Sequence, residues 1–232
     1  MRREFITKAV GFISAVAGLG VLSFVLFPIV SYSVDGSTSF KSYLSPVPGE
    51  QILSVESVDY TKASNWFEED NVVFETAETS KVRFYNLSIP KLGIEDATVA
   101  IGGEDLSESL IQYPGTALPG KRGNAVIFGH SILPQFYNPK DYLAIFSTLP
   151  TIKKSDQVIV RYDGITYTYK VEEIFEVEPT DLEILAQNIT DSYVTLITCT
   201  PPGHPLRPKR LIVRARLDPL GTISDNGQNS WN

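Results

Sequence analysis

The apolar positions of the chain follow two different patterns. From Ala9 to Val30 there are 22 consecutive residues without a charge, AVGFISAVAGLGVLSFVLFPIV. From Lys81 onward the apolar residues come in short runs, several of which alternate with polar residues and end at Gly, Pro or Asp. A long uncharged run is typical of a membrane-spanning helix, because about 20 apolar residues cross the hydrocarbon core. Short alternating runs are typical of β-strands.

The residues around the long apolar run predict its orientation. Arg2, Arg3 and Lys8 precede it, and the next basic residue is Lys41. Because basic residues stay on the cytoplasmic side, residues 1–30 are expected to form a cytoplasmic N-terminus and a single membrane anchor, with the rest of the chain outside the cytoplasm. A cleaved signal peptide is the alternative. Its apolar core is usually about 7–15 residues long and ends at a small-x-small site, which LFPIVSYSV matches poorly.

Residues 31–80 differ in composition from the rest of the chain. They hold nine acidic residues and two lysines, a net charge of −7 that equals the net charge of the whole chain. With Ser, Pro and Gly near its start, this segment is interpreted as an acidic stalk. Trp66 and Phe67 are unfavourable in water, so part of 58–74 is expected to pack on the edge of the following domain. A flap over an active site is the alternative.

The pattern from Lys81 onward predicts seven or eight strands. The runs are KVRFYNLSIP, ATVAIGG, NAVIFGH, DQVIVRYDGITYTYKVEEIFEVEP, SYVTLITC and RLIVRARL, and the fourth is expected to be a hairpin that turns at Asp163 and Gly164. DLSESLIQYPG and DYLAIFSTLPTIKKSD are interpreted as helical turns. This many short strands with Gly and Pro between them indicates a closed barrel or a sandwich over 81–217, followed by a polar tail, 218–232.

Composition excludes several kinds of site. One cysteine and two histidines fall short of the common zinc ligand sets, glycine-rich phosphate signatures are absent, and no metal or cofactor is predicted. The residues outside 31–80 carry no net charge, which argues against nucleic acid as a partner. One acidic group is interpreted as solvated loop carboxylates, with calcium binding as the alternative: Glu95, Asp96, Glu104, Asp105 and Glu108.

The single cysteine, Cys199, is the strongest candidate for chemistry. An unpaired thiol outside the cytoplasm is buried, linked to another chain or reactive. A nucleophilic thiol needs a partner that supports the thiolate. His130 ends the strand NAVIFGH, whose scaffold can aim it, whereas His204 lies in a loop, so His130 is preferred as the partner.

An arginine is a plausible third member of such a site. It stays charged and can donate to an oxyanion that develops during attack on a carbonyl. Arg210 begins the strand RLIVRA, so sheet pairing would set its position relative to the Cys199 strand. Arg207 lies in a loop between Leu206 and Pro208, and position alone leaves both arginines as candidates.

Four segments resemble the sortase family. TLITC resembles the sortase signature T-L-x-T-C, and RLIVRA resembles the arginine-led strand that follows it. YPGTALPGKRGNAVIFGHS resembles the segment that carries the sortase histidine, and IPKLGIEDATVAIGG resembles the first strands of the domain. Together they cover about 81–217. The resemblance implies an all-β fold, an eight-stranded sortase-like β-barrel with short helices, preceded by one N-terminal transmembrane helix and the acidic stalk.

The resemblance also implies an activity. Cys199 would be the nucleophile, His130 the general acid/base and Arg210 the group that orients the substrate or holds the oxyanion. The implied enzyme is a membrane-anchored cysteine transpeptidase that cleaves a C-terminal Leu-Pro-x-Thr-Gly-like sorting signal through a thioester. It transfers the protein to an amine of a cell-wall precursor or of another surface protein. Three residues are expected to contact the substrate: Thr198, His204 and Arg207.

Two rival interpretations and one open question accompany this expectation. A membrane-tethered cysteine protease would begin with the same chemistry and end in hydrolysis, and a non-catalytic β-barrel binding module would keep the thiol buried. The segments PGTALPG and TCTPPG resemble the pilin-polymerising and housekeeping-like non-A classes more than class A. No second membrane segment is expected after the barrel, unlike in many pilin-polymerising sortases, so the subclass stays open.

Overall fold

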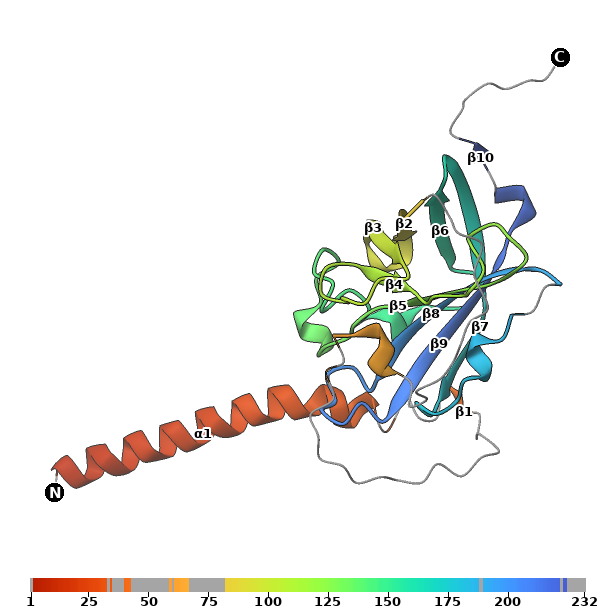
Figure 1. Ribbon diagram of the computed structural model, residues 1–232. Helices are drawn as coiled ribbons and strands as arrows, with labels where there is room; N and C mark the ends of the chain where they lie inside the picture. Colours follow the sequence, from red (N-terminus) through yellow and green to blue (C-terminus); the bar gives the residue numbers. More distant parts are fainter. Residues whose placement is uncertain are drawn as a thin grey trace, which may run out of the picture. The chain divides into compact units, whose positions relative to one another are not determined.

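The computed structural model of the chain describes residues 2–32, 34, 40–42, 59, 61–66, 82–187, 190–221 and 223–224 (Figure 1). The chain divides into two units, Met1–Ser39 and Phe40–Asn232. In the first unit, helix α1 spans Arg2–Ser31, and its part Lys8–Ser31 is long and apolar enough to cross a membrane. Its large apolar side chains are exposed, as expected of a helix whose solvent is lipid. A signal sequence shares this length and composition.

The second unit is built from strands, and the eight longest strands of its sheet form a closed ring. Their order around the ring is β7, β6, β2, β3, β4, β5, β8 and β9, and β9 pairs again with β7. The eight strands are β2 Phe84–Ile89, β3 Ile94–Ile101, β4 Leu110–Gln112, β5 Gly123–Phe128, β6 Gln157–Tyr162, β7 Ile165–Val177, β8 Ser192–Thr200 and β9 Lys209–Leu217. The predicted eight-stranded all-β barrel is therefore confirmed.

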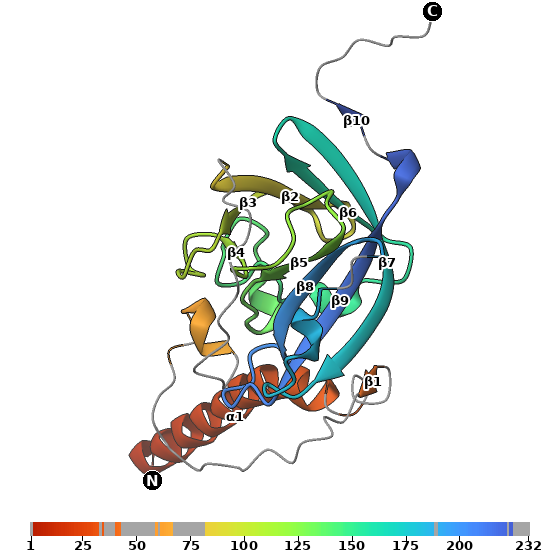
Figure 2. The same ribbon diagram turned by 45° about the vertical axis from the view of Figure 1, so that its right-hand side comes forward.

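Two short strands add to the outside of the ring. Strand β1, Lys41–Ser42, pairs parallel with β7, and β10, Ile223–Ser224, pairs antiparallel with it. Within the ring the β3–β4 and β5–β8 pairs are parallel and the other pairs are antiparallel. Figure 2 shows β7, β9 and β8 side by side on one wall of the barrel.

Alternation along the strands produces two apolar clusters. Every strand of the ring contributes to the first, which fills the barrel interior and includes Leu87, Val99, Ile127, Leu196 and Val213. The second covers the outer face of the β4, β5, β8, β9 and β7 wall; its members include Trp66, Phe128, Phe175, Ile184, Ile197, Cys199 and Ile212. Because successive side chains of a strand point to opposite faces, Leu196 lies inside the barrel and Cys199 outside it.

Among the residues that the structure describes, the short helices are single 3-10 turns. They are η2 Ala63–Trp66, η3 Pro90–Leu92, η4 Pro134–Phe136, η5 Leu149–Thr151, η6 Glu183–Leu185 and η7 Pro219–Gly221. The hairpin turn at Asp163 and Gly164 is confirmed, since β6 ends just before it and β7 begins just after it, with φ values of 50° and 71°. The segment DLSESLIQYPG is not a helical turn throughout, because strand β4 lies within it.

Candidate active site

Sheet pairing brings three sequence-predicted residues to one end of the outer face. Cys199 on β8 lies directly opposite Arg210 on β9 in the antiparallel pair. Strand β5 runs parallel to β8, with Phe128 opposite Ile197. His130 follows Phe128 by two residues, so the same register brings it level with Cys199. The cysteine strand thus lies between a neighbour that supplies an arginine and a neighbour that supplies a histidine.

Hydrogen bonds join the segment around His130 to the cysteine strand. The Gly129 amide donates to the Ile197 carbonyl over 3.1 Å. The Thr198 hydroxyl donates to the Gly129 carbonyl over 2.8 Å, and the Ser131 hydroxyl donates to the Cys199 carbonyl, also over 2.8 Å. All three bonds cross between β8 and the chain just after β5, where the regular ladder ends. They hold the backbone of the histidine against that of the cysteine.

Arg210 is held in one orientation. Its side chain is buried, with an exposed fraction of 1%. Nη1 donates to the carbonyl of Arg207 at 2.9 Å and to that of Lys209 at 3.3 Å, and Nη2 donates to the carbonyl of Trp66 at 3.0 Å. A planar guanidinium whose donors are spread over several carbonyls cannot rotate freely. It therefore presents a fixed cation beside Cys199.

The Trp66 segment, residues 61–66, covers this site. Trp66 is fully buried, and its ring centroid lies 5.3 Å from that of Phe128 and 5.7 Å from that of His130. Cζ of Arg210 lies 5.5 Å from the same ring. Trp66 and Cys199 belong to one apolar cluster. The indole therefore lies among the three candidate residues and excludes water from them.

The Trp66 segment is attached to the loop between β3 and β4. Lys62 and Asp105 form a β-bridge, and the Ala63 amide donates to the Glu104 carbonyl over 3.0 Å. The expectation that part of 58–74 packs on the domain holds for 61–66. Phe67 and the rest of that range beyond 66 lie outside the described residues.

Burial keeps His130 uncharged. Desolvation lowers the pKa of its imidazole from the usual 6.5 to about 4, and the positive charge of Arg207 acts in the same direction. The carboxylates of Asp59 and Asp105 oppose the shift. Nε2 of His130 is buried and has no hydrogen-bond partner among the described residues. At neutral pH the covered site therefore holds a neutral imidazole with one ring nitrogen available.

The thiol of Cys199 is likewise uncharged while the site is covered. Burial raises its pKa, because a thiolate is poorly stabilised away from water. The positive charges of Arg210 and Arg207 act against this effect. Uncovering the site would rehydrate both groups and remove the larger, opposing contribution. The arginines would then favour the thiolate, the form in which cysteine is a nucleophile.

The three residues expected to contact the substrate occupy different environments. The Thr198 hydroxyl is buried and donates to Gly129, as described above. His204 is half-buried in the loop between β8 and β9, and its Nδ1 accepts a hydrogen bond from the Leu206 amide at 3.2 Å. Arg207, in the same loop with a φ of 43°, acts on both His130 and Cys199 through its charge.

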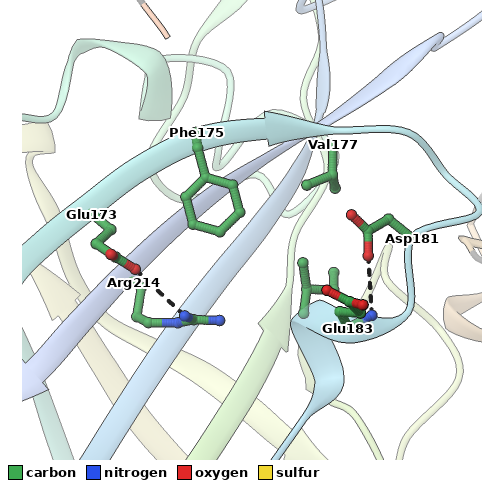
Figure 3. A pocket seen from close by; sticks show the side chains of 7 residues that line it. Glu173, Phe175, Val177, Asp181, Glu183 and Arg214 are labelled. Carbon is green, nitrogen blue, oxygen red and sulfur yellow. Dashed lines mark hydrogen bonds and ion pairs between the residues drawn. The ribbon is translucent and has the colours of Figure 1, made fainter. Parts of the chain in front are cut away.

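A pocket that the sequence did not reveal lies farther along the same outer face. It has a volume of about 250 Å³ and lies between β7, β9 and the segment around η6 (Figure 3). Arg214 and Glu173 form an ion pair across it at 3.4 Å, and the Asp181 carboxylate accepts from the Glu183 amide at 3.1 Å. The lining residues are Glu173, Phe175, Val177, Asp181, Glu183, Ile184 and Arg214.

The pocket is connected to the candidate site through the sheet. Val177, which lines it, lies directly opposite Arg210 in the β7–β9 pair. Within the part of the chain that the structure describes, no group of three or more His, Cys, Asp or Glu side chains could hold a metal ion.

A closed eight-stranded barrel that brings a cysteine, a histidine and an arginine to one end of its wall is the arrangement expected of the sortase family. The family model for the sortase domain matches residues 87–218, and the chain belongs to the sortase family. Sortases are cysteine transpeptidases, so the match places the chain in a family of enzymes.

Individual relatives agree with the family match. Sortase A of Streptococcus agalactiae is 28% identical over 124 residues, which are 53% of this chain and 48% of the relative. The chain thus spans about half the length of this curated relative. The crystal structure of sortase C-1 from Actinomyces oris is 29% identical, with a TM-score of 0.52 over 61% of this chain and 77% of that one. A lid mutant of sortase A from Corynebacterium diphtheriae is 30% identical, with a TM-score of 0.51 over 62% and 75%.

The lowered pKa of His130 predicts how stability changes with pH. A folded-state pKa of about 4 lies below the unfolded value of 6.5, so the unfolded chain binds the proton more tightly. The contribution to stability is complete above about pH 6.5 and is lost as the pH falls towards 4, with a total on the order of 3 kcal/mol. His130→Gln should remove this loss.

Chemical denaturation of the wild type and of His130→Gln between pH 7 and pH 4 measures the effect. The free energy of unfolding of the wild type minus that of His130→Gln should fall by on the order of 3 kcal/mol from pH 7 to pH 4. His204→Gln is the matched control and should give a curve parallel to that of the wild type. Parallel curves for His130→Gln as well would contradict the burial of a neutral imidazole.

Proposed function

We propose that the chain is a membrane-anchored sortase-type cysteine transpeptidase. It cleaves a C-terminal Leu-Pro-x-Thr-Gly-like sorting signal through a thioester and transfers the protein to an amine of a cell-wall precursor or of another surface protein. The observation that carries this proposal is the convergence of Cys199, His130 and Arg210. Arg210 lies directly opposite the cysteine in the sheet, and hydrogen bonds from the Ser131 and Thr198 hydroxyls to backbone carbonyls join the histidine segment to the cysteine strand.

In the first half of the proposed reaction, the sulfur of Cys199 attacks the carbonyl carbon of the substrate threonine. The Arg210 guanidinium donates to the oxygen on which negative charge develops, where a fixed donor commonly stabilises the transition state by about 2.7–4 kcal/mol. His130 carries the thiol proton to the glycine nitrogen as the carbon–nitrogen bond breaks. The products are a thioester on Cys199 and a free C-terminal fragment with a neutral amine.

In the second half, the acceptor amine attacks the thioester carbonyl. His130 accepts a proton from the amine and returns one to the sulfur as the carbon–sulfur bond breaks, so the new amide forms and the thiol is restored. Covalent catalysis divides amide exchange into two easier steps. Arg207 and His204 contact the substrate in this proposal, Thr198 supports the site from the barrel interior through its bond to Gly129, and the pocket around Arg214 and Phe175 receives part of the sorting signal.

The chain organisation follows the same proposal. Residues 1–30 anchor the enzyme with its N-terminus in the cytoplasm, and the acidic stalk 31–80 carries the catalytic domain 81–217 and the tail 218–232 outside the cell. Protein substrates with a sorting signal and the acceptor amine meet the enzyme at that surface. No cofactor takes part in either step.

The Trp66 segment acts as a lid in this proposal. It covers the cysteine. The Trp66 carbonyl accepts the hydrogen bond from Nη2 of Arg210 that the proposed reaction gives to the substrate. The chain resembles a solved sortase A whose structure is that of a lid mutant. Opening would expose Cys199, release the Nη2 donor of Arg210 and rehydrate the imidazole of His130.

The reaction is tested with a panel of labelled sorting peptides and amines, with the products identified by mass spectrometry. The wild type should form a thioester and, with an amine present, an amide product. Cys199→Ala should form neither, because no thiol remains. His130→Ala should come close to this loss, while His204→Ala, the matched control, should be mild.

The outcomes separate the rival activities. Hydrolysis at the same rate with and without amine would indicate a cysteine protease. A folded wild type that forms no thioester with any peptide would indicate a binding module. Equal loss at His130→Ala and His204→Ala would contradict the assignment of the general acid/base.

The planar guanidinium of Arg210 predicts that lysine substitutions at Arg210 and Arg207 have different effects on the transfer rate. Lysine keeps the charge but loses the planar donor pair, so Arg210→Lys should lower the transfer rate by about 100-fold or more. Arg207→Lys, the matched change three residues earlier in the loop, should lower it only a few-fold. Circular dichroism confirms that both variants are folded. If Arg207→Lys proves the crippling change, the two roles must be exchanged.

The lid predicts faster modification of Cys199 when Trp66 is shortened. Trp66→Ala removes the ring that lies among His130, Phe128 and Arg210, so alkylation by iodoacetamide should accelerate by about tenfold or more. Leu87→Ala, which creates a cavity in the barrel interior instead, is the control for general loosening. An unchanged rate for Trp66→Ala, or an equal increase for both variants, would contradict a lid over the thiol.

A further inference from the structure

Ser131 lies next to His130 in sequence and touches Cys199 in space. Its side chain is buried, with an exposed fraction of 5%, and its hydroxyl donates to the Cys199 carbonyl over 2.8 Å. The following loop is held separately, because the Ile132 amide donates to the Ser147 hydroxyl over 2.9 Å. Ser131 therefore bonds directly to the residue that supplies the thiol, while its own neighbour supplies the imidazole.

The Ser131 hydroxyl replaces a backbone hydrogen bond that would otherwise extend the ladder between β5 and β8. Between β5 and β8 the Gly129 amide donates to the Ile197 carbonyl. In a parallel pair such bonds recur every two residues, so the next would join the amide of residue 131 to the carbonyl of Cys199. Strand β5 ends at Phe128, and the Ser131 side chain donates to that carbonyl instead. The spacing of the two strands is thus maintained to the level of the nucleophile.

We propose that Ser131 is a positioning residue for the cysteine and histidine. It fixes the backbone of Cys199 relative to that of His130, and with it the positions from which the sulfur and the imidazole exchange a proton in both halves of the reaction. This inference rests on the proposed function, since it gives Ser131 a part in that same chemistry. Ser131 itself touches neither the substrate nor the reacting atoms.

Ser131 is uncharged, so it does not contribute to the electrostatic effects on His130 and Cys199. Arg207, Asp59 and Asp105 act on His130, and Arg210 and Arg207 act on Cys199. Ser131→Ala removes one hydroxyl and leaves these charges in place, so a change in the proton exchange would report geometry. Ser131→Thr keeps a hydroxyl at the same position and is the rescue variant.

The test uses the full chain in detergent and four forms: wild type, Ser131→Ala, Ser131→Thr and Ser192→Ala. Ser192 is a matched control, because it is a buried serine at the opposite end of β8 whose hydroxyl lies 3.4 Å from that of Tyr169. Peptide transfer gives kcat and KM for each form. The rate of Cys199 alkylation by iodoacetamide, followed from pH 5 to pH 10, reports the thiol and its histidine without any peptide.

Ser131→Ala should lower kcat by about 10- to 100-fold with KM within about twofold, because a small misplacement of reacting groups has effects of this size. Alkylation takes place in the uncovered site, where Arg210, Arg207 and His130 favour the thiolate, so losing the alignment of His130 should move the alkylation profile to higher pH. Ser131→Thr should restore both quantities to within about threefold of the wild type, and Ser192→Ala should leave both unchanged.

Two results would overturn the inference. One is a Ser131→Ala variant that is less stable to heat but keeps the wild-type kcat and alkylation profile, because the hydroxyl would then serve the fold alone. The other is an equal change in Ser192→Ala. Failure of the proposed function looks different: the wild type would transfer no peptide, while the alkylation profiles would still show whether Ser131 controls the thiol.

Discussion

The parallel pairing of β5 with β8 is the constraint on which the candidate site depends. It places the end of one strand beside the end of the other, so that a histidine just past β5 lies level with a cysteine near the end of β8. The antiparallel β8–β9 pair then brings Arg210 opposite that cysteine. A shift of one residue in either pair would turn the side chains concerned to the other face of the sheet, into the barrel interior. The filled interior, with Leu196 and Val213 in it, is therefore what keeps both registers in place.

Burial determines the chemical state of the site. Trp66 and its neighbours surround a thiol and an imidazole that are each neutral, because neither charged form is stable without water. The cation of Arg210 is tolerated there because backbone carbonyls accept from its nitrogens. In the proposed reaction, the same groups become reactive when the Trp66 segment opens and water returns.

Local sequence patterns predicted the parts of this arrangement that are local. The strand runs, the turn at Asp163 and Gly164, and the position of His130 at a strand end all follow from neighbours within a few residues. Strand β4 was missed because three residues are too short to show an alternation. The contact between Arg210 and Trp66 joins residues 144 positions apart, and the pocket depends on a loop folding over the β7–β9 pair. The roles of Cys199, His130 and Arg210 remain predictions until their variants are measured.

Because Arg210 donates to the Trp66 carbonyl, the Trp66 segment, which belongs to the same chain, would compete with a free peptide for that donor. A segment of the same chain competes at an effective concentration that is independent of the protein concentration. If it occupied the site about 99% of the time, any free peptide would bind about 100-fold more weakly than the open site allows. A ligand confined to the same membrane surface would escape much of this handicap, because confinement raises its own local concentration. The covered barrel would thus discriminate by where a peptide is located as well as by its sequence.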